Sequence, residues 1–185
     1  MRNLLFLVLI LSVCTLTSCD SHSEDIGRME KRLLYENKGE RGVWITEYTY
    51  DFVEGIKMLA KEQMTLEKNG EFKEEITYYY EGTPLAKSLM TGTWEIEYDD
   101  DLDTYFFNQY FNDNIEIKNI NMSSDWFKRF DTDVRLRRKG DAYDMILEDS
   151  DDTLYGNEII DCSDEIFLIK DLEDDSAYRY EKSKN

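Results

Sequence analysis

The sequence is poor in the residues on which most enzymes depend. Its 185 residues include one histidine, His22, one proline and three cysteines. A single histidine disfavours serine and cysteine hydrolases, whose nucleophile uses a histidine as its base, and it disfavours histidine-rich zinc sites. Neither a P-loop nor a G-x-G-x-x-G motif is present. We therefore expect a protein that is not an enzyme, with no catalytic, cofactor-binding or metal-binding residues.

Positive charge is also scarce. Lysine and arginine number 22 against 41 aspartates and glutamates, which gives a net charge of −19. Proteins that bind nucleic acid need a basic face to neutralise phosphates, so nucleic acid is excluded as a partner. Hydrophobic residues make up 41% of the chain and aromatic residues 14%. This content is too high for a disordered protein, so we expect a folded domain.

The only long hydrophobic run lies at the start of the chain. Arg2 precedes the apolar segment Leu4–Leu11, and small polar residues follow up to Ser18. This order is typical of a secretory signal peptide. The apolar run is much shorter than the ~20 residues that a membrane-spanning helix needs. We predict a signal peptide over residues 1–18.

Leu16-Thr17-Ser18-Cys19 resembles the lipobox of bacterial lipoproteins. The resemblance implies that Cys19 carries the lipid and is the first residue of the mature protein, which would be held at a membrane by acyl chains such as palmitate. Cys14 would leave with the signal peptide. Only Cys162 then remains in the folded part, so no intramolecular disulfide can form, and a buried, unreactive thiol is expected there.

The residues after Cys19 bear on the location of the protein. In enteric bacteria an aspartate such as Asp20 in this position is similar to an inner-membrane retention signal. In other Gram-negative groups, a serine followed by acids, as in Ser23-Glu24-Asp25, is similar to a surface-export signal. We expect a cell-envelope protein, at the outer membrane rather than the inner one, facing either the periplasm or the surface. The alternative is a solvated spacer without an address.

Residues 19–40 are polar and predict a lipidated tether. Ile26, Met29, Leu33 and Leu34 recur at helical spacing and predict a short amphipathic helix within it. From residue 41 to 185, short runs of aromatic and β-branched residues alternate with charges, as in antiparallel strands. The predicted strands are Val43–Tyr50, Ile56–Glu67, Glu71–Tyr80, Thr93–Tyr98, Tyr105–Phe111, Ile115–Asn121, Asp133–Arg138, Ala142–Glu148, Glu165–Lys170 and Ala177–Glu181.

Four local features are predicted in more detail. A three-residue loop, Lys68-Asn69-Gly70, would pair Leu66 with Phe72 and leave Gly70 in a left-handed conformation. A two-residue loop, Lys139-Gly140, would pair Leu136 with Tyr143, Val134 with Met145 and Arg135 with Asp144. Short helices could begin at Thr83-Pro84 and after Ser124.

Several motifs resemble those of lipocalins and of the lipocalin-like domains in bacterial lipoproteins. They are the G-x-W opening Gly42-Val43-Trp44, the hairpin Met64–Phe72, the strand start Gly92-Thr93-Trp94, and the closing segments Ile166–Ile169 and Tyr178–Tyr180. The resemblance implies a mostly β fold, an antiparallel up-and-down barrel of the calycin type with one or two short helices. It also implies that Trp44 closes the bottom of the barrel against an arginine from a late strand, for which Arg179 is the candidate.

These observations predict a non-enzymatic, membrane-anchored binding protein whose barrel holds a small apolar ligand or is filled by its own side chains. The alternative is a surface adaptor or glycan-contacting protein with a filled barrel, using exposed aromatics such as Tyr79. Two buried carboxylates facing one another in a cleft would instead suggest an enzyme. The acidic runs at residues 99–103, 149–152 and 171–175 could hold Ca²⁺ through their oxygen atoms, but they lack EF-hand spacing, and we favour solvated turns.

Overall fold

The computed structural model describes residues 20–53, 56–112, 114–121, 134–139, 142–148, 154–171 and 175–184. The expected signal peptide, Cys19 and the helix predicted after Ser124 lie outside these ranges. The described elements are α2 (Asp20–Leu33), β1 (Arg41–Val53), β2 (Ile56–Glu67), β3 (Glu71–Tyr80), β4 (Thr83–Asp99), β5 (Thr104–Phe111), β6 (Asn114–Asn119), β7 (Val134–Lys139), β8 (Ala142–Glu148), β9 (Leu154–Cys162), β10 (Ile166–Asp171) and β11 (Ala177–Lys182).

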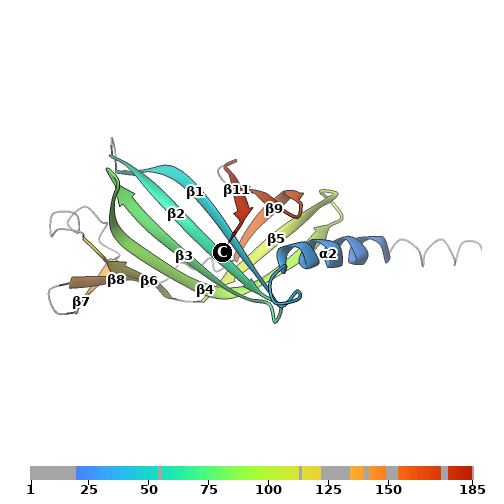
Figure 1. Cartoon of the computed structure of the whole chain (residues 1–185), viewed down its shortest axis with the longest axis horizontal. Helices are drawn as coiled ribbons and strands as arrows, with labels where there is room; N and C mark the ends of the chain where they lie inside the picture. Colours follow the sequence, from blue (N-terminus) through green and yellow to red (C-terminus); the bar gives the residue numbers. More distant parts are fainter. Residues whose placement is uncertain are drawn as a thin grey trace, which may run out of the picture.

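Eight of the strands close into an antiparallel barrel. The order is β3-β2-β1-β11-β10-β9-β5-β4, and the pairing of β3 with β4 completes the ring. Each neighbouring pair is antiparallel, and helix α2 lies at one end of the barrel (Figure 1). The prediction of a mostly β chain with a lipocalin-like antiparallel barrel and a short helix is confirmed.

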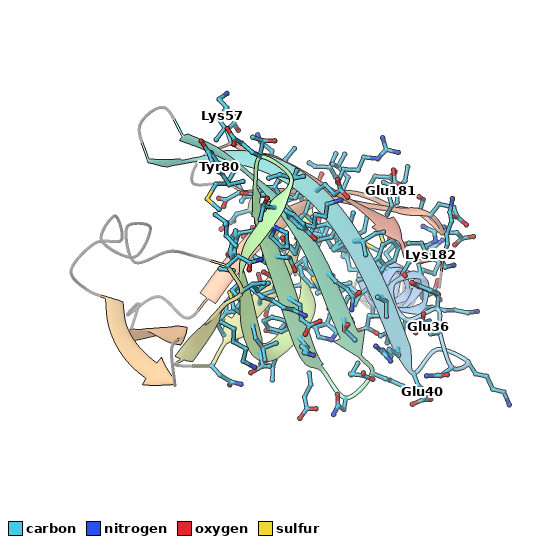
Figure 2. All side chains as sticks on the ribbon, turned by 60° about the vertical axis from the view of Figure 1, so that its left-hand side comes forward. Glu36, Glu40, Lys57, Tyr80, Glu181 and Lys182 are labelled. Atoms are coloured by element: carbon cyan, nitrogen blue, oxygen red, sulfur yellow. The ribbon has the colours of Figure 1, made fainter. Side chains whose placement is uncertain are left out.

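A second, smaller group of strands extends from the barrel. The 17-residue strand β4 pairs through its second half with β5 and through residues 86–89 with β6, and β8 and β7 follow β6. In Figure 1 this extension lies at the end of the molecule opposite α2. In Figure 2, Glu36 and Glu40 lie on the side of the helix, and Lys57 and Tyr80, at the far ends of β2 and β3, lie away from it.

The main core lies where α2 meets the barrel. The predicted amphipathic helix is confirmed, and it docks on the barrel through its apolar side. Leu33 and Leu34 are buried against Trp44, Phe107 and Phe167, and Ile26 and Met29 pack at the edge of this cluster. The Trp44 ring meets Phe167 at 5.9 Å between centroids, and Phe167 meets Phe107 edge-on at 5.2 Å. Aromatic packing of this kind fills the barrel at this end.

The first hairpin prediction is confirmed and the second is wrong. Leu66 pairs with Phe72, and Gly70 has a φ of 83°, as the three-residue loop requires. In the β7–β8 hairpin, however, Leu136 pairs with Met145 and Lys139 pairs with Ala142. The expected loop would have placed Lys139 at a positive φ, which a lysine disfavours. The observed register differs by two residues, so each side chain keeps its face of the sheet.

Two further predictions need correction. No helix begins at Pro84, because β4 starts at Thr83 directly after a turn at Glu81 and Gly82, both with positive φ. The register shifts between Tyr78 and Tyr79 where Pro84 pairs, and such irregular positions tolerate a proline. Strand β9 was not predicted at all. Its Gly156 and Asn157 are disfavoured in strands, yet it pairs with both β5 and β10.

Candidate functional site

Two glutamates lie inside the barrel, further along strands β2 and β3 than the aromatic core. Glu62 of β2 is 6% exposed and Glu74 of β3 is 7% exposed. Inward positions alternate with outward ones along a strand, and both glutamates occupy inward positions. Glu62 pairs with Ile76 and Glu74 with Met64, so the two carboxyl groups are diagonal neighbours on the inner face of adjacent strands.

Hydrogen bonds connect these glutamates to side chains of nearby strands of the barrel. The Tyr180 hydroxyl of β11 donates to Glu62 Oε1 at 2.5 Å, and Tyr48 of β1 also hydrogen-bonds to Glu62. Gln109 Nε2 of β5 donates to Glu74 Oε2 at 3.3 Å. We call these five residues, Tyr48, Glu62, Glu74, Gln109 and Tyr180, the polar layer of the barrel.

The acids of the polar layer titrate far above the range of surface glutamates. Burial raises the pKa of Glu62 to about 7, although the hydrogen bonds from Tyr180 and Tyr48 act in the opposite direction. Burial, and then the charge of nearby Glu62, raises the pKa of Glu74 to about 8. No lysine or arginine among the described residues pairs with either carboxyl group. Burial without a cationic partner therefore favours the protonated form of both acids.

A pocket of about 720 Å³ reaches the polar layer from the side of the barrel. Strands β1 and β11 pair only at Trp44 with Lys182 and at Ile45 with Glu181 within the described residues, whereas β1 and β2 pair along nearly their whole length. Beyond this point β1 and β11 separate, and the pocket opens between them. We call it the seam pocket. Its inner wall consists of Thr46, Tyr48, Glu62 and Tyr178.

The mouth of the seam pocket extends over the outer face of β1 to β4 and β11. Lys61 binds Glu47 at 2.6 Å, and Lys87 binds Glu75 at 3.1 Å. Arg179 binds Glu181 at 3.5 Å. The charged groups at the mouth therefore neutralise one another. The one ionisable group of the inner wall besides the tyrosines is Glu62, which has no such partner.

The G-x-W motif at the start of β1 has a physical explanation. The Trp44 indole N–H donates to the carbonyl oxygen of Leu33, the last residue of α2, at 3.0 Å. A Cβ atom on Gly42 would lie 1.7 Å from the same oxygen. Gly42 and Trp44 thus fix the end of the helix on the barrel together. Trp94 repeats part of this arrangement, because its indole N–H donates to the Glu67 carbonyl at 3.1 Å.

The prediction that Arg179 packs against Trp44 is wrong. Its side chain is 59% exposed and pairs with Glu181, because the alternation of β11 turns Tyr180 inward and Arg179 outward. The β11 residue beside Trp44 is instead Lys182. Its amine lies 4.1 Å from the centre of the Tyr35 ring, and Tyr35 packs edge-on against Trp44. The cation nearest to Trp44 is therefore Lys182 instead of Arg179, and Tyr35 lies between this cation and the tryptophan.

The remaining candidates form structural contacts. Cys162 is buried beside α2, and burial raises the pKa of its thiol to about 11, so it is unreactive at neutral pH. His22 stacks on Tyr98 at 3.7 Å and holds the start of α2 on the barrel. Asp99 caps the turn that follows it by accepting hydrogen bonds from the amides of Asp101 and Leu102. Within the described part of the chain, no three histidine, cysteine or acidic side chains gather as a metal site.

Sequence reasoning missed Glu62 and Glu74, although a signal was present. On β2, Glu62 interrupts the inward series Ala60, Met64, and on β3 Glu74 lies between Phe72 and Ile76. The predicted register of this hairpin already placed both acids on the same face as the apolar residues. An acid within the apolar face of a strand is the pattern that indicates a buried carboxyl group.

Comparisons with known proteins show no family for this chain. No protein-family model matches the chain, and no curated protein matches it. No helix within the described residues combines the length and apolarity that a bilayer crossing requires.

Proposed function

We propose that this chain is a lipid-anchored binding protein of the bacterial cell envelope, at the outer membrane, whose barrel takes up a small organic molecule without chemically changing it. The seam pocket carries this proposal. Its volume of about 720 Å³ lies within the range of ligand pockets, roughly 300–1,000 Å³. The inner wall combines the rings of Tyr48 and Tyr178 with the polar groups of Thr46 and Glu62, whereas the mouth is lined mainly by charged side chains that pair with one another. A ligand with both an apolar body and a polar group fits this wall better than a wholly apolar one.

The arrangement favours binding over catalysis. A paired-carboxylate hydrolase needs both acids on the same bond of the substrate. Glu62 lines the seam pocket, but Glu74 lies behind it and is not part of the wall. Gln109, with which Glu74 shares its hydrogen bond, is buried as well. A molecule in the pocket would therefore meet one acid of the pair, which suits recognition.

Binding can be tested with N-phenyl-1-naphthylamine, a neutral aromatic molecule whose fluorescence rises in an apolar site. We expect saturable, one-to-one binding by the full chain purified from membranes. Ala177→Trp should abolish it, because Ala177 lines the mouth of the pocket. Ile160→Trp is the matched control, since Ile160 is exposed on β9 away from the pocket. Absence of saturable binding, or equal loss in both variants, would contradict the proposal and favour a filled-barrel adaptor.

The lipid anchor is tested separately. Metabolic labelling with a palmitate analogue should label the chain, and the labelled protein should remain in the membrane fraction. Cys19→Ala should remove both the label and the membrane association, whereas Cys14→Ala should leave them unchanged. An unlabelled chain in the soluble fraction would overturn the anchor without affecting the pocket.

A further inference from the structure

We propose that the seam pocket binds an organic cation, whose ammonium group lies against Glu62 and supplies the positive charge that the buried glutamate pair lacks. This inference rests on the proposed binding function and adds the charge of the ligand to it. It stands on two observations together: a pocket that opens on the polar layer, and a buried acid on its wall without a cationic partner.

The distribution of charge in the pocket separates Glu62 from the other acids. Glu47, Glu75 and Glu181 each have a lysine or arginine partner within 3.5 Å. These pairs are surface groups that water also solvates. Glu62 is nine-tenths buried and has only hydroxyl donors as partners. A buried carboxylate costs free energy unless a cation compensates it. A positive group is therefore stabilised more beside Glu62 than anywhere else in the pocket.

The surroundings favour an organic cation over a metal ion. Calcium takes six to eight oxygen ligands, and the polar layer offers two carboxyl groups that no third acid joins among the described residues. Aromatic rings are abundant instead. Tyr48 and Tyr178 form part of the pocket wall and meet edge-on, with 5.6 Å between their centroids. Tyrosine rings attract ammonium groups through their π faces, which adds to the attraction of the carboxylate.

Binding of a cation should release protons. Among the described residues, the ionisable groups around Glu62 are all acids, and they come from three elements: Tyr48 of β1, Glu74 and Tyr78 of β3, and Tyr178 and Tyr180 of β11. The facing residues of β4 and β5, Ser88 and Gln109, do not ionise. A positive charge beside the pair favours the ionised carboxylate, so the proton that Glu62 or Glu74 holds leaves to the solvent.

The test compares 2-phenylethylammonium with 2-phenylethanol, which has the same ring and is neutral. Calorimetric titration of the full chain at pH 7.5 should show that the ammonium binds at least tenfold more tightly. Titrations in phosphate and in Tris, which differ in ionisation enthalpy, should reveal release of protons with the ammonium and none with the alcohol. Equal affinity for the two molecules, or no proton release, would overturn the inference.

Matched variants assign the effect to one residue. Glu62→Gln should weaken ammonium binding at least tenfold and leave binding of the alcohol and of N-phenyl-1-naphthylamine within twofold, which also shows that the variant is folded. Glu47→Gln, in the same pocket but already paired with Lys61, should change ammonium binding less than threefold. Equal losses in both variants would contradict the role of Glu62. If only N-phenyl-1-naphthylamine binds, this inference fails and the binding function stands; if no probe binds, both fail.

Discussion

Two levels of the barrel interior are built from the same strands in different ways. Beside α2, the inward residues of β2 and β3 are Leu66 and Phe72, and the level is filled with aromatic rings. Further along, one inward position beyond Phe72 on β3 and two beyond Leu66 on β2, the same strands contribute Glu74 and Glu62, and the level is polar. The aromatic level needs nothing beyond its own side chains. The polar level holds two acids with no cationic partner among the described residues, and one of them, Glu62, lines the seam pocket.

The largest effect is expected in the aromatic level. Trp44→Ala should lower the free energy of unfolding by roughly 3–5 kcal/mol, because it removes a fully buried ring. Trp44→Phe should cost about 1–2 kcal/mol, since it leaves the Leu33 carbonyl without its donor. Urea unfolding at pH 6 measures both. A loss below about 1 kcal/mol for the alanine variant would show that this level does not carry the fold.

The polar level should make stability depend on pH. The pKa values of Glu62 and Glu74 are raised above the ordinary value of 4.5 to about 7 and about 8. The folded state therefore holds more protons than the unfolded state between these values, and stability falls as the pH rises through this window. The loss is on the order of a few kcal/mol.

Urea unfolding from pH 5 to pH 9 measures this loss. The double variant Glu62→Gln, Glu74→Gln should be more stable than the wild-type chain at pH 9 and flatten the profile, because its amides stay neutral. Glu75→Gln is the control, because Lys73 and Lys87 lower the pKa of this outward acid. Parallel profiles for the wild-type chain and the double variant would contradict the assignment of the pH dependence to the polar level.

The two levels also differ in how well the sequence predicts them. Alternating apolar residues predicted the antiparallel strands, the resemblance to lipocalins implied the barrel, and the Asn69-Gly70 turn predicted the register of β2 and β3. The site was not predicted, because glutamates are usually surface residues and nothing in the sequence analysis singled out Glu62 or Glu74. The separation of β1 from β11 depends on how the ring closes, which local patterns do not encode. Strand β9 was missed because Gly156 and Asn157 have poor strand propensity. It forms because its pairing with β5 and β10 outweighs that propensity.

The contact between α2 and the aromatic level requires that Gly42 has no side chain. Gly42→Ala should cost about 1–3 kcal/mol, because its Cβ would overlap the Leu33 carbonyl and push the helix outward. Gly27→Ala is the matched control within α2, where a Cβ meets nothing within 4 Å, and it should stabilise the chain by up to ~1 kcal/mol. Thermal unfolding of both variants measures the difference. Similar effects of the two substitutions would contradict the close approach of α2.

The smallest effects distinguish the two cations of β11. Lys182→Ala should cost about 0.5–1 kcal/mol, because it removes the ammonium group above Tyr35, next to the aromatic level. Arg179→Ala should change stability by less than about 0.5 kcal/mol, since this exposed side chain pairs only with Glu181. Urea unfolding of the two variants in parallel resolves the order. If Arg179→Ala cost more stability than Lys182→Ala, this would contradict the assignment of Lys182 as the cation nearest Trp44 and of Arg179 as an outward-facing side chain of β11. The polar level would then lose Tyr180, whose hydroxyl reaches Glu62 only because Arg179 faces outward.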